Sequence, residues 1–264
     1  MGEAIVITSG KGGVGKTTTS ANIGTALALS GKKVCLVDAD IGLRNLDVMM
    51  GLENRIIYDL VDVVEERCKL KQALIKDKRF DCLYLLPAAQ TKDKTDILPT
   101  QMKQLIDELK SDYDYVLIDC PAGIEHGFRN AVAGADKAIV VTTPELSAVR
   151  DADRIIGLLE HENIDRPRLV VNRIRNHMMK NGDMLDVEEI TSILAIDLLG
   201  IVVDDDDVIK HANKGEPIAL HTTSRASIAY RNIARRILGE TVPLMVLEER
   251  RTMFSKLKRL FGVR

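Results

Sequence analysis

A glycine-rich segment near the N-terminus, from Gly10 to Thr18, places the strongest constraint on how this 264-residue chain can fold. It reads Gly-Lys-Gly-Gly-Val-Gly-Lys-Thr-Thr and follows the apolar run from Ala4 to Thr8. A β-branched run of this kind predicts a buried strand, and residues 16–29 predict a helix that ends before Gly31. A strand, a glycine loop and a helix in this order predict a phosphate-binding loop.

Two nucleotide-binding motifs overlap in this segment. Gly10, Gly12 and Gly15 match the dinucleotide motif G-x-G-x-x-G, whereas Gly10, Gly15, Lys16 and Thr17 match G-x-x-x-x-G-K-[ST]. In the second motif backbone N–H groups cradle phosphates, the lysine neutralises them and the threonine hydroxyl binds Mg²⁺. A dinucleotide loop has no chemical need for the lysine–threonine pair, so the sequence favours a nucleoside triphosphate. The predicted phosphate-binding residues are Gly10, Lys11, Gly12, Gly13, Val14, Gly15, Lys16, Thr17 and Thr18.

Strand and helix patterns alternate along most of the chain. Further buried strands are predicted at residues 33–38, 83–87, 115–119, 138–142, 168–172 and 198–203, and the last helix is predicted at 225–238. This alternation predicts an α/β fold with a doubly wound, mostly parallel sheet. We predict one P-loop domain over residues 1–240, a short linker over 241–249 and a separate tail over 250–264.

Several predicted strands end in polar side chains. Ligands of open α/β sheets bind beyond the carboxyl ends of the strands, so Asp38 and Asp40 are expected beside the glycine loop. Asp119 follows another strand and stands where a phosphate-loop enzyme has its Mg²⁺ partner, bound directly or through a second shell. Asn172 carries an amide suited to reading a base edge, although a turn residue is the plainer alternative. For Asp38, a role as a buried ligand of the loop backbone is as reasonable as a catalytic one.

Composition and cysteine spacing narrow the class of protein. The net charge is −2, and the four cysteines lie far apart with no C-x-x-C pair. This pattern predicts reduced structural thiols in a cytosolic protein and argues against an iron–sulfur carrier. No run approaches the ~18 apolar residues of a spanning helix, and the first strand leaves no room for a signal peptide, so neither export nor membrane spanning is expected.

The C-terminal segment, residues 250–264, has the pattern of a basic amphipathic helix. One face carries Met253, Phe254, Leu257, Leu260 and Phe261, and Lys256, Lys258 and Arg259 point elsewhere. From Glu248 onward, six Lys and Arg stand against two Glu, which gives +4 and leaves −6 for the remainder. Such a helix would lie in a membrane interface and bind it weakly and reversibly. A helix docked on its own domain and a calmodulin-type target are the alternatives.

The glycine loop departs from an ordinary Walker A motif because Lys11 follows its first glycine directly. With Asp38-Ala39-Asp40 and Asp119-Cys120-Pro121-Ala122-Gly123, the loop resembles the deviant Walker A family, which includes MinD, the ParA partition ATPases and the nitrogenase iron protein. The resemblance is closest to the MinD branch, over the whole chain. It includes Gly42-Leu43-Arg44-Asn45-Leu46-Asp47, Thr142-Thr143-Pro144-Glu145, the segment 148–154 and Lys258-Arg259-Leu260-Phe261-Gly262.

The resemblance implies a role for each matching residue. Lys16 and Thr17 would hold phosphate and Mg²⁺, Asp119 would support Mg²⁺, and Lys11 would reach the partner's phosphates in a nucleotide-sandwiched homodimer. Asp40 would orient or activate water, which makes Lys11, Lys16 and Asp40 the candidate catalytic residues. Asn172 would read adenine. The candidate partner-binding residues are Arg44, Asn45, Asp151 and Asp153.

The family resemblance also implies a function. It predicts an ATP- and Mg²⁺-dependent ATPase that dimerises on ATP, binds the inner face of the cell membrane and recruits a MinC-like inhibitor to control septum placement. A MinE-like activator or a polar anchor protein would be further partners. The alternatives are a DNA- or cargo-partitioning ATPase of the ParA type and a flagellar-number ATPase. An acidic core with basic charge gathered in an amphipathic tail favours lipid over nucleic acid.

Overall fold

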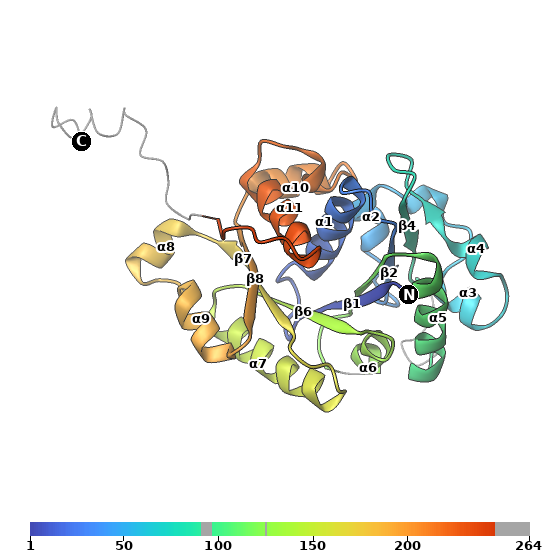
Figure 1. Ribbon diagram of the computed structural model, residues 1–264, viewed down its shortest axis with the longest axis horizontal. Helices are drawn as coiled ribbons and strands as arrows, with labels where there is room; N and C mark the ends of the chain where they lie inside the picture. The colour runs from blue at the N-terminus through green and yellow to red at the C-terminus, as the bar shows by residue number, and fades with distance from the viewer. Residues whose placement is uncertain (91–96, 125, 246–264) are drawn as a thin grey trace.

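The computed structural model, which describes residues 1–90, 97–124 and 126–245, is an eight-stranded sheet covered by helices on both faces (Figure 1). The predicted α/β fold is therefore confirmed. The strands are β1 (Glu3–Thr8), β2 (Val34–Asp38), β3 (Ile75–Lys76), β4 (Leu83–Leu86), β5 (Tyr115–Asp119), β6 (Lys137–Thr142), β7 (Arg168–Ile174) and β8 (Asp197–Val203).

The helices of the described residues alternate with these strands. They are α1 (Lys16–Leu29), α2 (Leu46–Met50), α3 (Leu60–Val64), α4 (Leu70–Ala73), α5 (Pro99–Asp112), α6 (His126–Val132), α7 (Leu146–His161), α8 (Asn176–Asn181), α9 (Val187–Leu194), α10 (Asp206–Ala212) and α11 (Arg225–Ile237), with short 3₁₀ turns η1 (Glu53–Arg55) and η2 (Ile218–Leu220). None of the helices described is long and apolar enough to cross a bilayer.

The sheet has the strand order β3-β4-β2-β5-β1-β6-β7-β8, and only the short β3 runs antiparallel to its neighbour. β1 lies near the middle, paired with β5 on one side and β6 on the other. The strands β2 to β5 lie on one side of β1, and the strands β6 to β8 lie on the other side. The strand order therefore reverses at β1. Open α/β sheets bind ligands at such a point, beyond the carboxyl ends of the strands. The loop after β1 is the glycine-rich segment.

Two hydrophobic cores lie on opposite faces of the sheet. One contains residues of α1, α2 and α11, and the other contains residues of α5, α6, α7 and α9. On α11 the buried side chains Ala226, Tyr230, Ile233 and Ile237 recur at intervals of four, three and four residues. This spacing places them on one helix face, directed at the sheet. β1, between both layers, is buried from Ala4 to Thr8.

Three helices begin at other residues than the sequence predicts. The sequence predicts that Pro144 opens a helix, but α7 begins at Leu146, with Glu145 as its N-cap. It predicts a loop over residues 41–47, but α2 already begins at Leu46. It predicts that the aspartates at 204–207 cap a helix from Val208; they do cap a helix, but α10 begins at Asp206, where Asp205 accepts the Asp207 N–H at 3.0 Å. The predicted tail helix and its linker from residue 246 lie outside the described residues.

Candidate functional site

The glycine loop lies between β1 and α1 and has close neighbours on two sides. Gly15, the residue before α1, has φ +99°, and a Cβ there would lie 2.3 Å from Asn172 Nδ2. A Cβ on Gly10 would lie 2.1 Å from the backbone oxygen of Asp151 on α7. The loop can pass this close to β7 and α7 only because both positions are glycine.

The loop directs the start of α1 towards the crevice. Lys16 is the first residue of α1 and is 8% exposed, and no side chain of the described residues caps the helix. The first N–H groups of a helix have no partners within it, and the helix dipole adds positive potential at this end. The N-terminus of α1, the backbone of the loop and the Lys16 ammonium thus form a site suited to anionic phosphate groups.

Lys11 behaves differently from Lys16. Its side chain is exposed, and its Nζ donates to Ser147 Oγ on α7 at 3.1 Å. Its backbone oxygen accepts from Ser9 Oγ at 2.8 Å, which fixes the main chain while the ammonium stays at the surface. A lysine with a fixed backbone and an exposed head group can exchange its serine partner for another anion or polar group.

Thr17 and Asp119, the two predicted Mg²⁺ residues, lie in contact with each other. The Thr17 hydroxyl hydrogen-bonds to the Asp119 carboxylate, and Ser20 Oγ donates to Asp119 Oδ1 at 2.9 Å. Burial raises the pKa of Asp119 to about 6, while the bonds from Thr17 and Ser20 and the charge of Lys16 oppose this rise. The sequence did not single out Ser20, although its position one turn after Lys16 places it on the same face of α1.

Asp38 is a buried carboxylate at the end of β2, beside Asp119 in the sheet register. It accepts the Asp40 N–H at 3.0 Å and the Leu46 N–H at 3.2 Å, so it holds both ends of the loop 40–46. Burial, with the charge of Asp119 as a second cause, raises the pKa of Asp38 to about 8. The sequence left two roles open for Asp38, a buried ligand of the loop backbone and a catalytic group. These two hydrogen bonds favour the first role.

Asp40 itself is half-buried at the start of this loop, where its carbonyl accepts the N–H groups of Leu43 and Arg44. Arg44 has φ +38°, and its Nε lies 2.8 Å from Oδ2 of the buried Asp47. Arg44 was predicted to bind a partner protein, but its guanidinium forms this ion pair within its own chain. Asn45, by contrast, is exposed before α2.

Asn172 lies within β7 rather than after it, because the strand continues to Ile174. Its Nδ2 donates to the Val14 backbone oxygen at 2.8 Å and its Oδ1 accepts the Arg173 N–H at 2.9 Å. The buried amide therefore ties the glycine loop to β7. The expected contact with a base remains a prediction.

A cavity of about 340 Å³ opens beside Asn172, and this volume lies within the range of small-molecule sites. It is lined by the end of β7, the residues that follow β7 and β8, α10, α11 and the start of α1, including Thr18, Asn172, Arg173, Val208, Ile209 and Tyr230. The sequence did not predict Arg173, Val208 or Ile209 as site residues. Arg173 lies near the carboxyl end of β7, and Val208 and Ile209 lie on α10, which follows the carboxyl end of β8, so their position at this edge of the sheet was their signal. A larger surface hollow of about 960 Å³ lies beside α4 and α5 and is lined by none of the predicted site residues.

Asp151 and Asp153 lie on α7. The side chain of Asp151 is 35% exposed and lies 4.0 Å from Arg154, and Asp153 is exposed. Because the backbone of Asp151 contacts Gly10, this part of α7 adjoins the phosphate loop directly. The predicted tail residues, from Met253 to Phe261, lie outside the described residues.

Comparisons with known proteins agree with this geometry. An AAA domain family matches residues 2–166. The septum site-determining protein MinD of Bacillus subtilis (strain 168) is 75% identical over 267 aligned residues, which cover all of both chains.

Two solved structures extend the similarity. A chain of the MinC:MinD cell division protein complex from Aquifex aeolicus is 51% identical with a TM-score of 0.88, over 94% of this chain and all of that one. The septum site-determining protein MinD complexed with Mg-ADP from Pyrococcus horikoshii OT3 is 29% identical with a TM-score of 0.82, over 90% of this chain and 96% of that one.

Proposed function

The chain belongs to the MinD/ParA family of P-loop ATPases, and from this premise we propose that it is a membrane-cycling ATPase of cell division. It binds Mg²⁺ and ATP, dimerises on ATP, and hydrolyses ATP to ADP and phosphate slowly without a partner. The ATP-bound dimer binds the inner face of the cytoplasmic membrane and recruits a MinC-like inhibitor that controls septum placement. The released protein returns to the cytoplasm.

The arrangement around Asp119 supports the nucleotide and metal part of this proposal. Thr17 would bind Mg²⁺ directly, and Asp119, which hydrogen-bonds to the Thr17 hydroxyl, would orient that ligand and stabilise the ion. The loop backbone and Lys16 would hold the phosphates, and the cavity beside Asn172 would take the adenosine. The relative from Pyrococcus horikoshii carries Mg-ADP, which supports the same ligands here.

The position of Lys11 is the observation that carries the dimerisation step. Its ammonium is exposed and, among the described residues, hydrogen-bonds to the neutral hydroxyl of Ser147, which a phosphate oxygen of a second subunit's nucleotide can replace. In the phosphoryl-transfer transition state negative charge spreads over the transferred group, so a cation supplied in trans stabilises it. Asp40, at the start of the loop 40–46, would position the attacking water.

The C-terminal tail supplies the proposed membrane anchor. One amphipathic helix of about 12 residues binds weakly, since each basic residue near an anionic surface contributes only ~1 kcal/mol. Two helices joined in a dimer bind at high effective concentration, which raises avidity by ~10²–10⁴. ATP would thus promote membrane binding, and hydrolysis would promote release, without any change in the helix itself.

The partner part of the proposal rests on α7 and the loop 40–46. Asp151 and Asp153 of α7, with the exposed Asn45, would contribute to a surface for a MinC-like inhibitor, and the Aquifex aeolicus relative is found in a MinC:MinD complex. A MinE-like activator or a polar anchor protein would compete for or share this surface. No specific nucleic acid is expected as a partner.

Mass measurement and liposome sedimentation test the proposal together. The wild type should double its mass with ATP but not ADP and should pellet with anionic liposomes under the same condition. Lys11→Ala should stay monomeric and soluble with ATP while still binding nucleotide. Lys103→Ala, which removes an exposed lysine paired with Asp107 far from the loop in sequence, is the matched control and should behave as wild type.

Two results would contradict the proposal. Equal pelleting with ATP and ADP would show that membrane binding does not depend on which nucleotide is bound. Shifts of DNA in a gel at low salt, without liposome binding, would favour the ParA-like alternative.

A further inference from the structure

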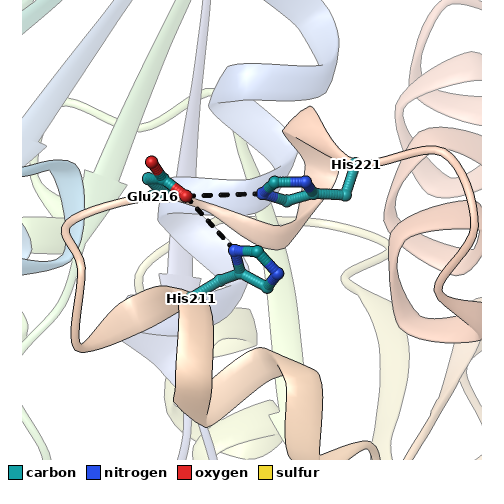
Figure 2. Close-up of side chains that lie close together, drawn as sticks. All are labelled: His211, Glu216 and His221. Carbon is teal, nitrogen blue, oxygen red and sulfur yellow. Dashed lines mark hydrogen bonds and ion pairs between the residues drawn. The ribbon is translucent and has the colours of Figure 1, made fainter.

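Three side chains outside the proposed nucleotide site converge at the end of α10. His211 lies in the last turn of α10, Glu216 in the turn that follows, and His221 directly after η2 (Figure 2). They are spaced five residues apart in the sequence, a spacing that no helix or strand period brings together. The irregular path of the chain between α10 and α11 creates the cluster.

Backbone hydrogen bonds hold this path in place. The Glu216 N–H donates to the His211 carbonyl at 3.0 Å, which fixes the first two residues relative to each other. The His221 carbonyl accepts a hydrogen bond from Ser227 on α11. Between them, the Ala219 N–H donates to Asn22 Oδ1 on α1 at 2.8 Å. The three side chains are therefore presented by a segment anchored on two helices of the core.

The distances within the cluster match the ligand spacing of a small metal ion. Oε2 of Glu216 lies 3.3 Å from His211 Nδ1 and 3.6 Å from His221 Nε2. All three ligand atoms lie within 4.8 Å of one another. Tetrahedral Zn²⁺ with bonds of ~2.0–2.2 Å places its ligand atoms about 3.3–3.5 Å apart. Only small side-chain adjustments are needed for one ion to contact all three atoms.

One nitrogen of the cluster lacks a hydrogen bond. His221 Nε2 is buried and has no hydrogen-bond partner among the described residues, although it points at the Glu216 carboxylate. A buried nitrogen without a hydrogen bond is costly, and a bound cation would satisfy it. The two rings stack with centroids 3.7 Å apart at a 37° tilt, and each has one nitrogen near the same oxygen, Oε2 of Glu216.

The ligand set decides which cation fits. Neutral imidazoles and a carboxylate suit Zn²⁺ and similar transition metals, whereas Mg²⁺ and Ca²⁺ prefer oxygen ligands alone. The side chains of the three residues are 22%, 44% and 36% exposed in chain order, which leaves access for a water as a further ligand.

We propose that His211, Glu216 and His221 form a binding site for a divalent transition-metal cation, with Zn²⁺ as the reference ion. The ion would join the C-terminal end of α10 to the segment after η2. α10 also lines the cavity beside Asn172, so occupancy of this site would restrain one wall of that cavity.

Metal titration of the full chain tests this proposal. Tag-free protein, treated with chelator and free of nucleotide, is titrated with Zn²⁺ by calorimetry in the presence of excess Mg²⁺, which occupies any oxygen-ligand site. One Zn²⁺ per chain is expected. His211→Ala, Glu216→Gln and His221→Ala should each weaken binding by at least ~10-fold. His177→Ala, which removes an exposed histidine on α8, is the matched control and should bind as wild type.

A spectroscopic measurement on the wild type removes any dependence on how the variants fold. Bound Co²⁺ should give visible absorption of a four- or five-coordinate nitrogen and oxygen site. Absence of saturable Zn²⁺ binding would overturn the proposal. A thiolate charge-transfer band, or loss of binding in Cys68→Ser with retention in Glu216→Gln, would place the ion on a cysteine and would overturn it equally.

Discussion

Replacing Gly10 with alanine tests whether the glycine loop is packed against α7 as the structure shows. An added Cβ would lie 2.1 Å from the Asp151 backbone oxygen and 2.3 Å from its carbonyl carbon. Favourable non-bonded carbon contacts lie near 3.5–4.0 Å, so the loop or α7 must move by more than ~1 Å. These two atoms belong to the backbone, and the third close atom, Asp151 Cβ at 2.6 Å, is fixed to it, so no rotamer change relieves the clash. Overpacking commonly costs ~1–3 kcal/mol, and we expect a loss of at least ~2 kcal/mol in unfolding free energy.

Gly12→Ala is the matched control for this substitution, because its Cβ would lie 3.8 Å from Ala122 Cβ, an ordinary contact. It should change the unfolding free energy by less than ~1 kcal/mol. Urea unfolding of the nucleotide-free protein, followed by far-ultraviolet circular dichroism, compares the two variants without any effect of bound phosphate. Equal midpoints for Gly10→Ala and Gly12→Ala would refute the close packing of loop and α7.

Two further predictions concern the buried polar groups. Ser20→Ala should destabilise the protein by ~1.5–3 kcal/mol in urea unfolding at pH 8, because it removes a hydrogen bond to Asp119, whose pKa burial raises to about 6. Ser30→Ala removes only a bond to a backbone carbonyl and should cost less, so similar losses would contradict the role of the carboxylate. Burial also raises the pKa of the Cys120 thiol to about 12, so thiol labelling of the native protein, located by mass spectrometry, should reach the half-buried Cys68 well before Cys120. Equal labelling rates would show that β5 opens more readily than its burial implies.

The central strands could be predicted from the sequence because burial on both faces leaves an unbroken apolar run. β2 and β5 both end in an aspartate, and the rule that ligands bind at the carboxyl ends of parallel strands predicts Asp38 beside the glycine loop. The pairing of Asp38 with Asp119 depends on the strand order, which the sequence does not show. The two-residue β3 carries no comparable signal, since its pairing with β4 depends on tertiary contact alone. The bond from Asn172 to Val14 joins residues 158 positions apart, and no local pattern encodes it. The cluster of His211, Glu216 and His221 could not be predicted for the same reason, because an irregular segment of the chain brings these residues together.

α7 connects the parts of the proposed cycle. Ser147 holds Lys11, and Asp151, one turn later on the same helix face, meets Gly10, so both contacts of the loop fall on one side of α7. If Lys11 leaves Ser147 to act on a second subunit's nucleotide, the loop loses one of these contacts while the rigid Gly10 contact remains. The same displacement would alter the surface around Asp151, where a partner is proposed to bind. A partner sensitive to that surface could thus distinguish the dimer from the monomer, without any movement of the sheet.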